Sequence, residues 1–128
     1  MNLAKKGSLH FQMNLAECYY KGRGVKQDYK EAMKWYHKAA DQGDADALYE
    51  LGLFYYEGRG VKQDYKEAVK WFKKAGNSGA KYYLGLCYYN GHGVSVDKEE
   101  AWRCWYEAKE RNNEDAAKAL QEYFNYEE

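Results

Sequence analysis

Several features that would direct a protein to a membrane, to nucleic acid or to a disulfide framework are missing from this sequence of 128 residues. No apolar run approaches the roughly 20 residues of a membrane span. The three cysteines are an odd number, which excludes a fully paired disulfide framework. Lysine and arginine number 20, as do aspartate and glutamate, so no net charge attracts nucleic acid or an anionic membrane. We therefore expect neither as a partner.

The amino terminus also lacks the apolar segment of a signal peptide. Its first seven residues, MNLAKKG, contain two lysines, but no apolar stretch follows them. Together with the odd number of cysteines, this predicts a reducing, cytoplasmic location for the chain as written. A secreted or periplasmic parent stays open as the alternative for a trimmed chain. Proline is absent altogether, which is compatible with short helices joined by glycine turns.

What the sequence does contain is an internal repeat. The segment GRGVKQDYKEA occurs at 22–32 and again, letter for letter, at 58–68, and a looser copy, GHGVSVDKEEA, occupies 91–101. Self-similarity at such a period predicts a stacked solenoid, in which each unit contacts only its neighbours. The copies divide a single domain, 1–128, into repeats 8–43, 44–79 and 80–112 and a capping helix at 113–128.

Each repeat is expected to form two antiparallel helices. The first carries an apolar stripe at i, i+3, i+4 and i+7 and ends at a glycine suited to the left-handed conformation. In the second repeat the stripe is Leu48, Leu51, Gly52 and Tyr55, and the glycine is Gly58, matched by Gly22 and Gly91. The second helix begins at Asp28, Asp64 or Asp97, with Glu31, Glu67 or Glu100 three residues later. This spacing predicts a reciprocal cap, in which the Glu side chain also reaches back to the Asp N–H.

Three irregularities carry further expectations. Residues 44–46 have no counterpart before Ala80, so the first helix of the third repeat should start almost a turn late and alter the curvature. Residues 1–7 align with the end of a second helix, which indicates a slice or a descendant of a longer solenoid. The last helix, capped by Asn112 or Asn113, should bury one apolar stripe and leave a polar residue in the slot that no further unit covers. That stripe is Ala117, Leu120, Gln121 and Phe124.

These stripes and turns resemble the Sel-one-like repeat (SLR) family, a branch of the tetratricopeptide-like solenoids. The residues that carry the resemblance, here in the second repeat, are Leu51, Gly52, Tyr55, Gly58, Gly60, Val61, Asp64, Ala68, Trp71, Phe72 and Ala75. The third repeat departs from the pattern at Cys104, which takes the position of Trp35 and Trp71. The resemblance implies an all-α, right-handed α-solenoid of antiparallel helix pairs, with roles as an adaptor or scaffold. It implies no shared catalytic residues.

In tetratricopeptide-like arrays the first helices of the repeats line the concave side, so recognition is expected between their stacking stripes. We call the ten candidate residues the inner face: Met13, Glu17, Tyr20, Tyr49, Glu50, Leu53, Tyr56, Tyr82, Leu86 and Tyr89. The wider set adds Asn14, Lys21, Glu57, Tyr83, Asn90, Lys118, Glu122 and Asn125. Exposed tyrosine and leucine on such a face mark interaction sites.

Comparison between the copies separates two kinds of position on the inner face. Tyr20, Tyr56 and Tyr89 are the same in every repeat, so contacts between repeats explain them. The positions of Glu17, Leu53 and Leu86, and those of Met13, Tyr49 and Tyr82, vary. For the varying positions, ligand contact and packing onto a neighbouring repeat both stay open.

Other candidate residues have simpler interpretations. His10, His37 and His92 have no partner at metal-ligand spacing, so we expect solvated side chains and no metal or other cofactor. Cys18 and Cys87 take the slot of Phe54, and the three cysteines are expected as small buried or half-buried residues. A positive stripe is expected on the outer, solvated side of the molecule. It contains Lys34, Lys38, Lys70, Lys73 and Lys74, with Arg23 and Arg59.

An enzyme is the weaker alternative. Ser78 and Lys81, like Ser95 and Lys98, have the Ser-x-x-Lys spacing of acyl-serine enzymes such as β-lactamases, but the companion motifs are absent. The sequence therefore predicts a non-enzymatic adaptor, expected as a monomer, that binds a peptide or protein on its inner face. The other alternative is a structural segment of a longer solenoid, whose partner contacts lie elsewhere.

Overall fold

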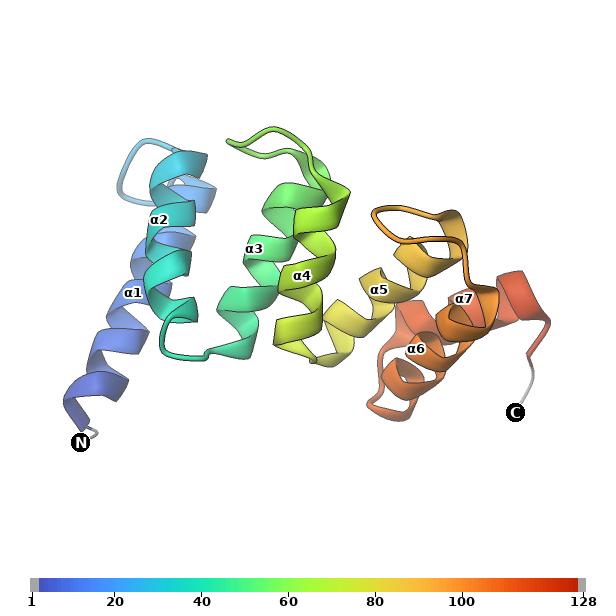
Figure 1. Ribbon diagram of the computed structural model, residues 1–128. Coiled ribbons are helices and arrows are strands. Elements are labelled where there is room, and N and C mark those ends of the chain that lie inside the picture. Colours follow the sequence, from blue (N-terminus) through green and yellow to red (C-terminus); the bar gives the residue numbers. More distant parts are fainter. Residues whose placement is uncertain (1–2, 127–128) are drawn as a thin grey trace.

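The computed structural model describes residues 3–126, with side chains from residue 8 onward, and every regular element within them is a helix. The helices are α1 (Leu3–Lys21), α2 (Tyr29–Ala40), α3 (Ala45–Glu57), α4 (Tyr65–Ala75), α5 (Ser78–Asn90), α6 (Lys98–Glu110) and α7 (Glu114–Phe124). Each helix packs against the next along the chain, and successive antiparallel pairs lie side by side from one end of the molecule to the other (Figure 1). The predicted all-α solenoid of paired helices is confirmed.

The amino-terminal residues that align with the end of a second helix are part of the first helix in this structure. Residues 3–7 are the first residues of α1, which continues to Lys21 without a break. A helix that already extends over several turns propagates at little cost, because each added residue gains a hydrogen bond. Residues 1 and 2 lie outside the described part of the chain.

The predicted caps of the second helices are half right. The side chains of Asp28, Asp64 and Asp97 each accept a hydrogen bond from the backbone N–H three residues later, at 3.0–3.1 Å. The reciprocal half is wrong, because the N–H of Asp28 donates to the Tyr19 carbonyl at 2.9 Å, and Asp64 and Asp97 repeat this pattern. That carbonyl belongs to the last turn of α1, where carbonyls lack a partner within the helix. Freed from the cap, Glu31 forms an ion pair with Lys34.

The two glycines of each turn have different roles. Gly58 ends α3 in the left-handed conformation, with φ at 70°, as predicted from its place in the repeat. The second glycine is a point of contact between repeats: a Cβ on Gly93 would lie 2.6 Å from the carbonyl carbon of Tyr65 in the preceding repeat. Gly24, which follows α1, has nothing within 4 Å of its Cβ position. The Gly-x-Gly pair therefore both ends a helix and allows the next repeat to stack closely.

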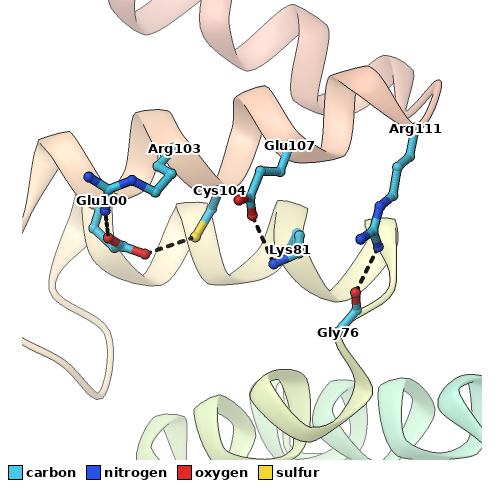
Figure 2. A network of polar contacts seen from close by, with 7 residues as sticks. All are labelled: Gly76, Lys81, Glu100, Arg103, Cys104, Glu107 and Arg111. Carbon is cyan, nitrogen blue, oxygen red and sulfur yellow. Dashed lines mark hydrogen bonds and ion pairs between the residues drawn. The ribbon is translucent and has the colours of Figure 1, made fainter.

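The late start predicted for the third repeat is wrong. Helix α5 begins at Ser78 behind the cap Asn77, at the same register as α3 behind Asp44, and both helices have 13 residues. Two of the missing residues come from the connection, since only Gly76 and Asn77 separate α4 from α5. The third comes from the end of α4, which has 11 residues where α2 has 12. Arg111, at the end of α6, donates to the Gly76 carbonyl at 2.9 Å and ties this short connection to the third repeat (Figure 2). Beyond it, α5 runs obliquely to α3 and α4 (Figure 1).

Small residues opposite large rings bring the helices of a repeat together. A Cβ on Gly52 would lie 2.5 Å from the Phe72 ring, and one on Gly85 would lie 2.1 Å from the Trp105 indole nitrogen. Both rings are fully buried. Leu51 and Leu84 belong to hydrophobic clusters that extend over adjoining repeats. Stability in such an array comes mainly from contacts within repeats and between nearest neighbours.

The last helix differs slightly from its prediction. Asn113 caps α7 by accepting from the Ala116 N–H at 2.8 Å, while Asn112 adopts a left-handed φ of 67° where the earlier repeats have glycine. The fully buried residues are Ala116 and Leu120, whereas Ala117 is only half-buried. Gln121 is exposed, as expected for the outer side of a terminal helix. The burial is displaced by one residue from the predicted stripe; α7 packs mainly on α6, with ring contacts from Tyr89 of α5 to Tyr123 and Phe124.

Candidate functional site

The ten residues of the inner face lie on the odd-numbered helices α1, α3 and α5, and every one of them is half-buried. None belongs to the fully buried core, and none projects freely into solvent. The large apolar side chains that are exposed within the described residues lie elsewhere: Phe11, Val25, Val96 and Tyr123. The inner face is therefore a partly accessible surface made mainly of tyrosine and leucine side chains.

The three tyrosines that every repeat shares pack onto neighbouring rings. Tyr20 lies 5.7 Å from Phe54 of the next repeat, between ring centroids. Tyr56 lies 5.2 Å from Tyr83 of the next repeat and 5.2 Å from Tyr65 of its own. Tyr89 lies 4.7 Å from Tyr123 of α7. Edge-on and tilted ring pairs of this kind stabilise the stack by about 0.5–1.5 kcal/mol each.

The side chains at the varying positions also contact neighbouring rings and the borders of the core clusters. Tyr49 lies 6.1 Å from both Phe72 and Tyr83, between ring centroids, and its ring covers Gly79 of α5, where an added Cβ would lie 3.0 Å away. Tyr83 stacks on Phe72 at 5.4 Å. Burial is the main cause that raises the pKa of the Tyr49 hydroxyl, and the neighbouring Tyr83 and Glu50 add to it. Leu53 and Leu86 pack on the borders of the second and third core clusters.

Carboxylates accompany the rings. Burial raises the pKa of Glu50, and the carboxylates of Asp46, Glu17 and Glu57 raise it further, whereas Lys21 lowers it. Glu17 forms an ion pair with Lys21 at 3.1 Å. Glu50 forms no ion pair or hydrogen bond of its side chain within the described residues. The inner face thus combines aromatic rings with a surplus of negative charge.

Arg59 corrects one prediction. It was expected on the positive outer stripe, but its guanidinium lies 2.7 Å from the Glu57 carboxylate and 5.2 Å from the centre of the Tyr20 ring. The turn after α3 brings it to the inner side, where both groups attract a cation. The lysines predicted for the outer stripe are exposed on the even-numbered helices. Two of them lie over tryptophan rings, Lys38 over Trp35 at 4.4 Å and Lys74 over Trp71 at 5.0 Å.

Two of the three histidines are not solvated as predicted. His10 is exposed, but His37 contacts the Trp71 ring edge-on at 5.3 Å. His92 stacks on Tyr65 at 4.2 Å with an interplanar angle of 4°. Both contacts join one repeat to the next, which the sequence did not indicate because the partners are far apart along the chain. Within the described residues, no group of three His, Cys, Asp or Glu side chains could hold a metal ion.

The cysteines have the predicted environments. Cys87 and Cys104 are buried and Cys18 is half-buried, and all three are free thiols. Burial raises the pKa of the Cys87 and Cys104 thiols to about 12. The Cys104 thiol donates to a carboxylate oxygen of Glu100 at 3.9 Å (Figure 2).

The Ser-x-x-Lys pairs lie outside the inner face and outside any enclosed site. Lys81 forms an ion pair with Glu107 of α6 at 2.9 Å, so its ammonium group is directed to α6 (Figure 2). Ser95 is exposed in the turn before α6, and Lys98 lies over the Tyr89 ring at 5.0 Å. Among the described residues, no hydrogen bond joins the serine and the lysine of either pair. None of the described helices has the length and apolar character needed to cross a membrane.

Comparison with known proteins agrees with this architecture. The Sel1 repeat family matches the chain three times, at residues 9–44, 45–79 and 78–113. A protective antigen of uropathogenic Escherichia coli with an SLR fold is 38% identical, with a TM-score of 0.85, over 91% of this chain and 26% of its own. A Sel1 repeat protein of Oxalobacter formigenes is 34% identical, with a TM-score of 0.87, over 96% of this chain and 51% of its own. This chain therefore spans about a quarter and about half of those two proteins.

A more distant structure shares the fold alone. The cysteine-rich protein B of Helicobacter pylori is 22% identical, with a TM-score of 0.72, over 90% of this chain and 93% of its own. No curated protein matches the sequence. Sel1 repeats are helical scaffolds whose common role is protein interaction. The three repeat matches, the paired helices and the solved relatives agree, and the chain belongs to the Sel1 repeat family.

Proposed function

We propose that this chain is a non-enzymatic adaptor that binds a peptide or a protein surface on its inner face. The observation that supports this most is that the odd-numbered helices carry two kinds of position, tyrosines shared by all repeats and side chains that vary between repeats. The tyrosines shared by all repeats, such as Tyr56, hold the stack together, whereas the varying positions lie beside them and keep part of their surface open. Stacking of similar repeats requires similar side chains at equivalent positions, whereas recognition of a ligand allows them to differ.

The chemistry of the varying positions suits a protein ligand. Tyr49, Leu53, Tyr82 and Leu86 offer two rings and two branched chains on adjoining helices. Tyrosine covers a large contact area at a small cost in conformational entropy. A stable interface buries about 800 Å² on each partner, so a ligand would have to extend along α3 and α5 together. An extended or helical segment that crosses both helices meets this requirement.

Replacing Tyr49, Leu53, Tyr82 and Leu86 with alanine should abolish binding. Because these side chains also contact the core clusters, the quadruple variant loses packing as well, so its folding has to be measured by circular dichroism. The double variant Leu53→Gln/Leu86→Gln keeps most of the side-chain volume and tests the face without large cavities. Val96→Gln, an exposed change in the turn before α6, is the matched control.

The binding assay is selection of random peptides displayed on phage, performed with the wild type and both inner-face variants. We expect peptides that bind the wild type and the Val96→Gln control but neither inner-face variant. If the enriched peptides bind all four proteins equally, the inner face is not the binding surface. If no peptide is enriched on the wild type, the proposal fails.

A further inference from the structure

Charge is divided between the two kinds of helix in the second repeat. Helix α3 contains Asp46, Glu50 and Glu57 and no lysine or arginine. Helix α4, on the outer side, contains four lysines and a single glutamate. In the second repeat, therefore, the helix that carries the inner face is negative and its partner on the outer side is positive.

The carboxylates of α3 share one side of the helix. Asp46, Glu50 and Glu57 are separated by four and seven residues, with Leu53 between the last two, so all lie along one stripe. Glu17 of α1 approaches the same stripe, since its carboxylate is among those that raise the pKa of Glu50. Glu50 lies in the middle of this row, half-buried and without an ion pair among the described residues. The row has a surplus of negative charge at its centre.

The negative charge continues toward α5 and α7. Asp115 of α7 raises the pKa of Tyr49, Tyr82 and Tyr83, although burial is the larger cause for each. The tyrosine hydroxyls of α3 and α5 are therefore within electrostatic reach of carboxylates from both α3 and α7. Aromatic faces and carboxylates both attract cations, and the attraction is stronger at partly desolvated positions.

The chain already contains one cation held in this way. Arg59 lies between the Glu57 carboxylate, at 2.7 Å, and the Tyr20 ring, at 5.2 Å from its centre. The guanidinium of Arg59 thus occupies the space between a carboxylate and a tyrosine ring. Around Glu50, Tyr49 and Tyr83 the same combination of groups is present. Lys21 lowers the pKa of Glu50 and Arg59 that of Tyr83, but these cations form their ion pairs with Glu17 and Glu57, and neither forms one with Glu50. A cation from a ligand would complete it.

We propose that the ligand of the inner face is a basic segment of a partner protein, rich in arginine or lysine and carrying some apolar side chains. This inference depends on the proposed function and adds the chemistry of the partner. The cationic groups would approach Glu50 and Asp115 over the tyrosine rings, and the apolar side chains would contact Leu53 and Leu86. The lysine-rich α4 on the outer side has the wrong charge for such a segment.

The composition of the selected peptides tests the inference separately from the proposed function. Among peptides that need Leu53 and Leu86, we expect arginine and lysine to exceed aspartate and glutamate several-fold. Peptides that need these leucines but are neutral or acidic would overturn the basic ligand and leave the binding face intact. Absence of any peptide that depends on the two leucines would overturn both.

A charge test on one selected basic peptide follows by fluorescence anisotropy. Glu50→Gln/Glu57→Gln should weaken binding about tenfold at low salt, whereas Glu99→Gln/Glu110→Gln, an equal change of net charge on α6, should change it less than about twofold. Raising the salt to about 0.5 M should remove most of the difference. An equal effect of both double variants would show that only net charge matters, and would contradict the inference.

A second copy of this chain, presenting its lysine-rich α4, is the competing occupant. Sedimentation of the wild type and of Lys70→Gln/Lys73→Gln distinguishes it. We expect a monomer in both cases. A dimer of the wild type that the lysine variant and Glu50→Gln/Glu57→Gln both dissociate would overturn the proposal of a separate basic partner.

Discussion

Substitution of Gly85 by alanine tests how the rings and the glycines set the distance between helices. A Cβ at this position would lie 2.1 Å from the Trp105 indole nitrogen and 2.4 Å from the adjacent carbon. Trp105 is fully buried, and its indole N–H donates to the Tyr82 carbonyl at 2.9 Å. The ring cannot move away without disturbing both its packing and this hydrogen bond.

The expected magnitude follows from three effects. Overpacking a core position costs about 1–3 kcal/mol, and weakening the indole hydrogen bond costs about 0.5–1.5 kcal/mol. Alanine is favoured over glycine inside a helix by about 1 kcal/mol. Gly85→Ala should therefore lower the free energy of unfolding by about 0.5–3.5 kcal/mol despite the better helix propensity.

Gly79→Ala is the matched control on the same helix. Its Cβ would meet the Tyr49 ring at 3.0 Å, but Tyr49 is half-buried and has room to shift toward the inner face. Helix propensity favours alanine at both positions, and more at Gly85 in the helix interior than at Gly79 in the first turn, so a lower stability of Gly85→Ala reflects its packing cost. Urea unfolding followed by circular dichroism measures both. If Gly85→Ala is as stable as Gly79→Ala, the close approach of α5 and α6 does not limit the side chain at position 85, and the reasoning is refuted.

Three further predictions concern the core and its titrating groups. Leu51→Ala, at a fully buried side chain, should lower the free energy of unfolding by about 2–5 kcal/mol in urea, and a neutral result would contradict the assigned register. Iodoacetamide should label Cys18 first in the native protein, because Cys87 and Cys104 keep their protons up to a pKa of about 12; equal labelling of all three, followed by mass spectrometry, would contradict their burial. Because the pKa of Glu50 is raised in the folded protein, the folded state binds more protons than the unfolded chain above about pH 4.5. The free energy of unfolding should therefore fall as the pH rises from 4.5 through the folded-state pKa of Glu50. Glu50→Gln should reduce this fall, and an unchanged pH profile would contradict the crowding of carboxylates.

The positions of helix caps and helix ends are the part of the fold that the sequence predicted well. A cap at Asp64 or a helix end at Gly58 depends on residues a few positions apart, and both are where the repeat placed them. The reciprocal role of Glu67 failed because the Asp64 N–H found a carbonyl of the preceding helix, Tyr55, across the turn. A pattern of neighbouring residues does not contain that competing partner.

Contacts between repeats were the part that could not be predicted. The stacking of His92 on Tyr65 and the placement of Arg59 beside Tyr20 join residues that only the packing of one repeat on the next brings together. The three residues missing before α5 were assigned to the helix start, whereas the structure removes two from the connection and one from the end of α4. A cap such as Asn77 fixes the first turn of a helix more strongly than the length of the loop before it.

Backbone amide shifts in a nuclear magnetic resonance titration with a selected basic peptide test the central claim most directly. The peptide should move the amide signals of Tyr49, Glu50, Leu53 and Leu86 and leave those of α2 and α4 nearly unchanged, with smaller shifts in the Glu50→Gln/Glu57→Gln variant. Shifts confined to the lysine-rich even-numbered helices would show that the protein binds on its outer side, and would contradict the assignment of the inner face as the site of recognition.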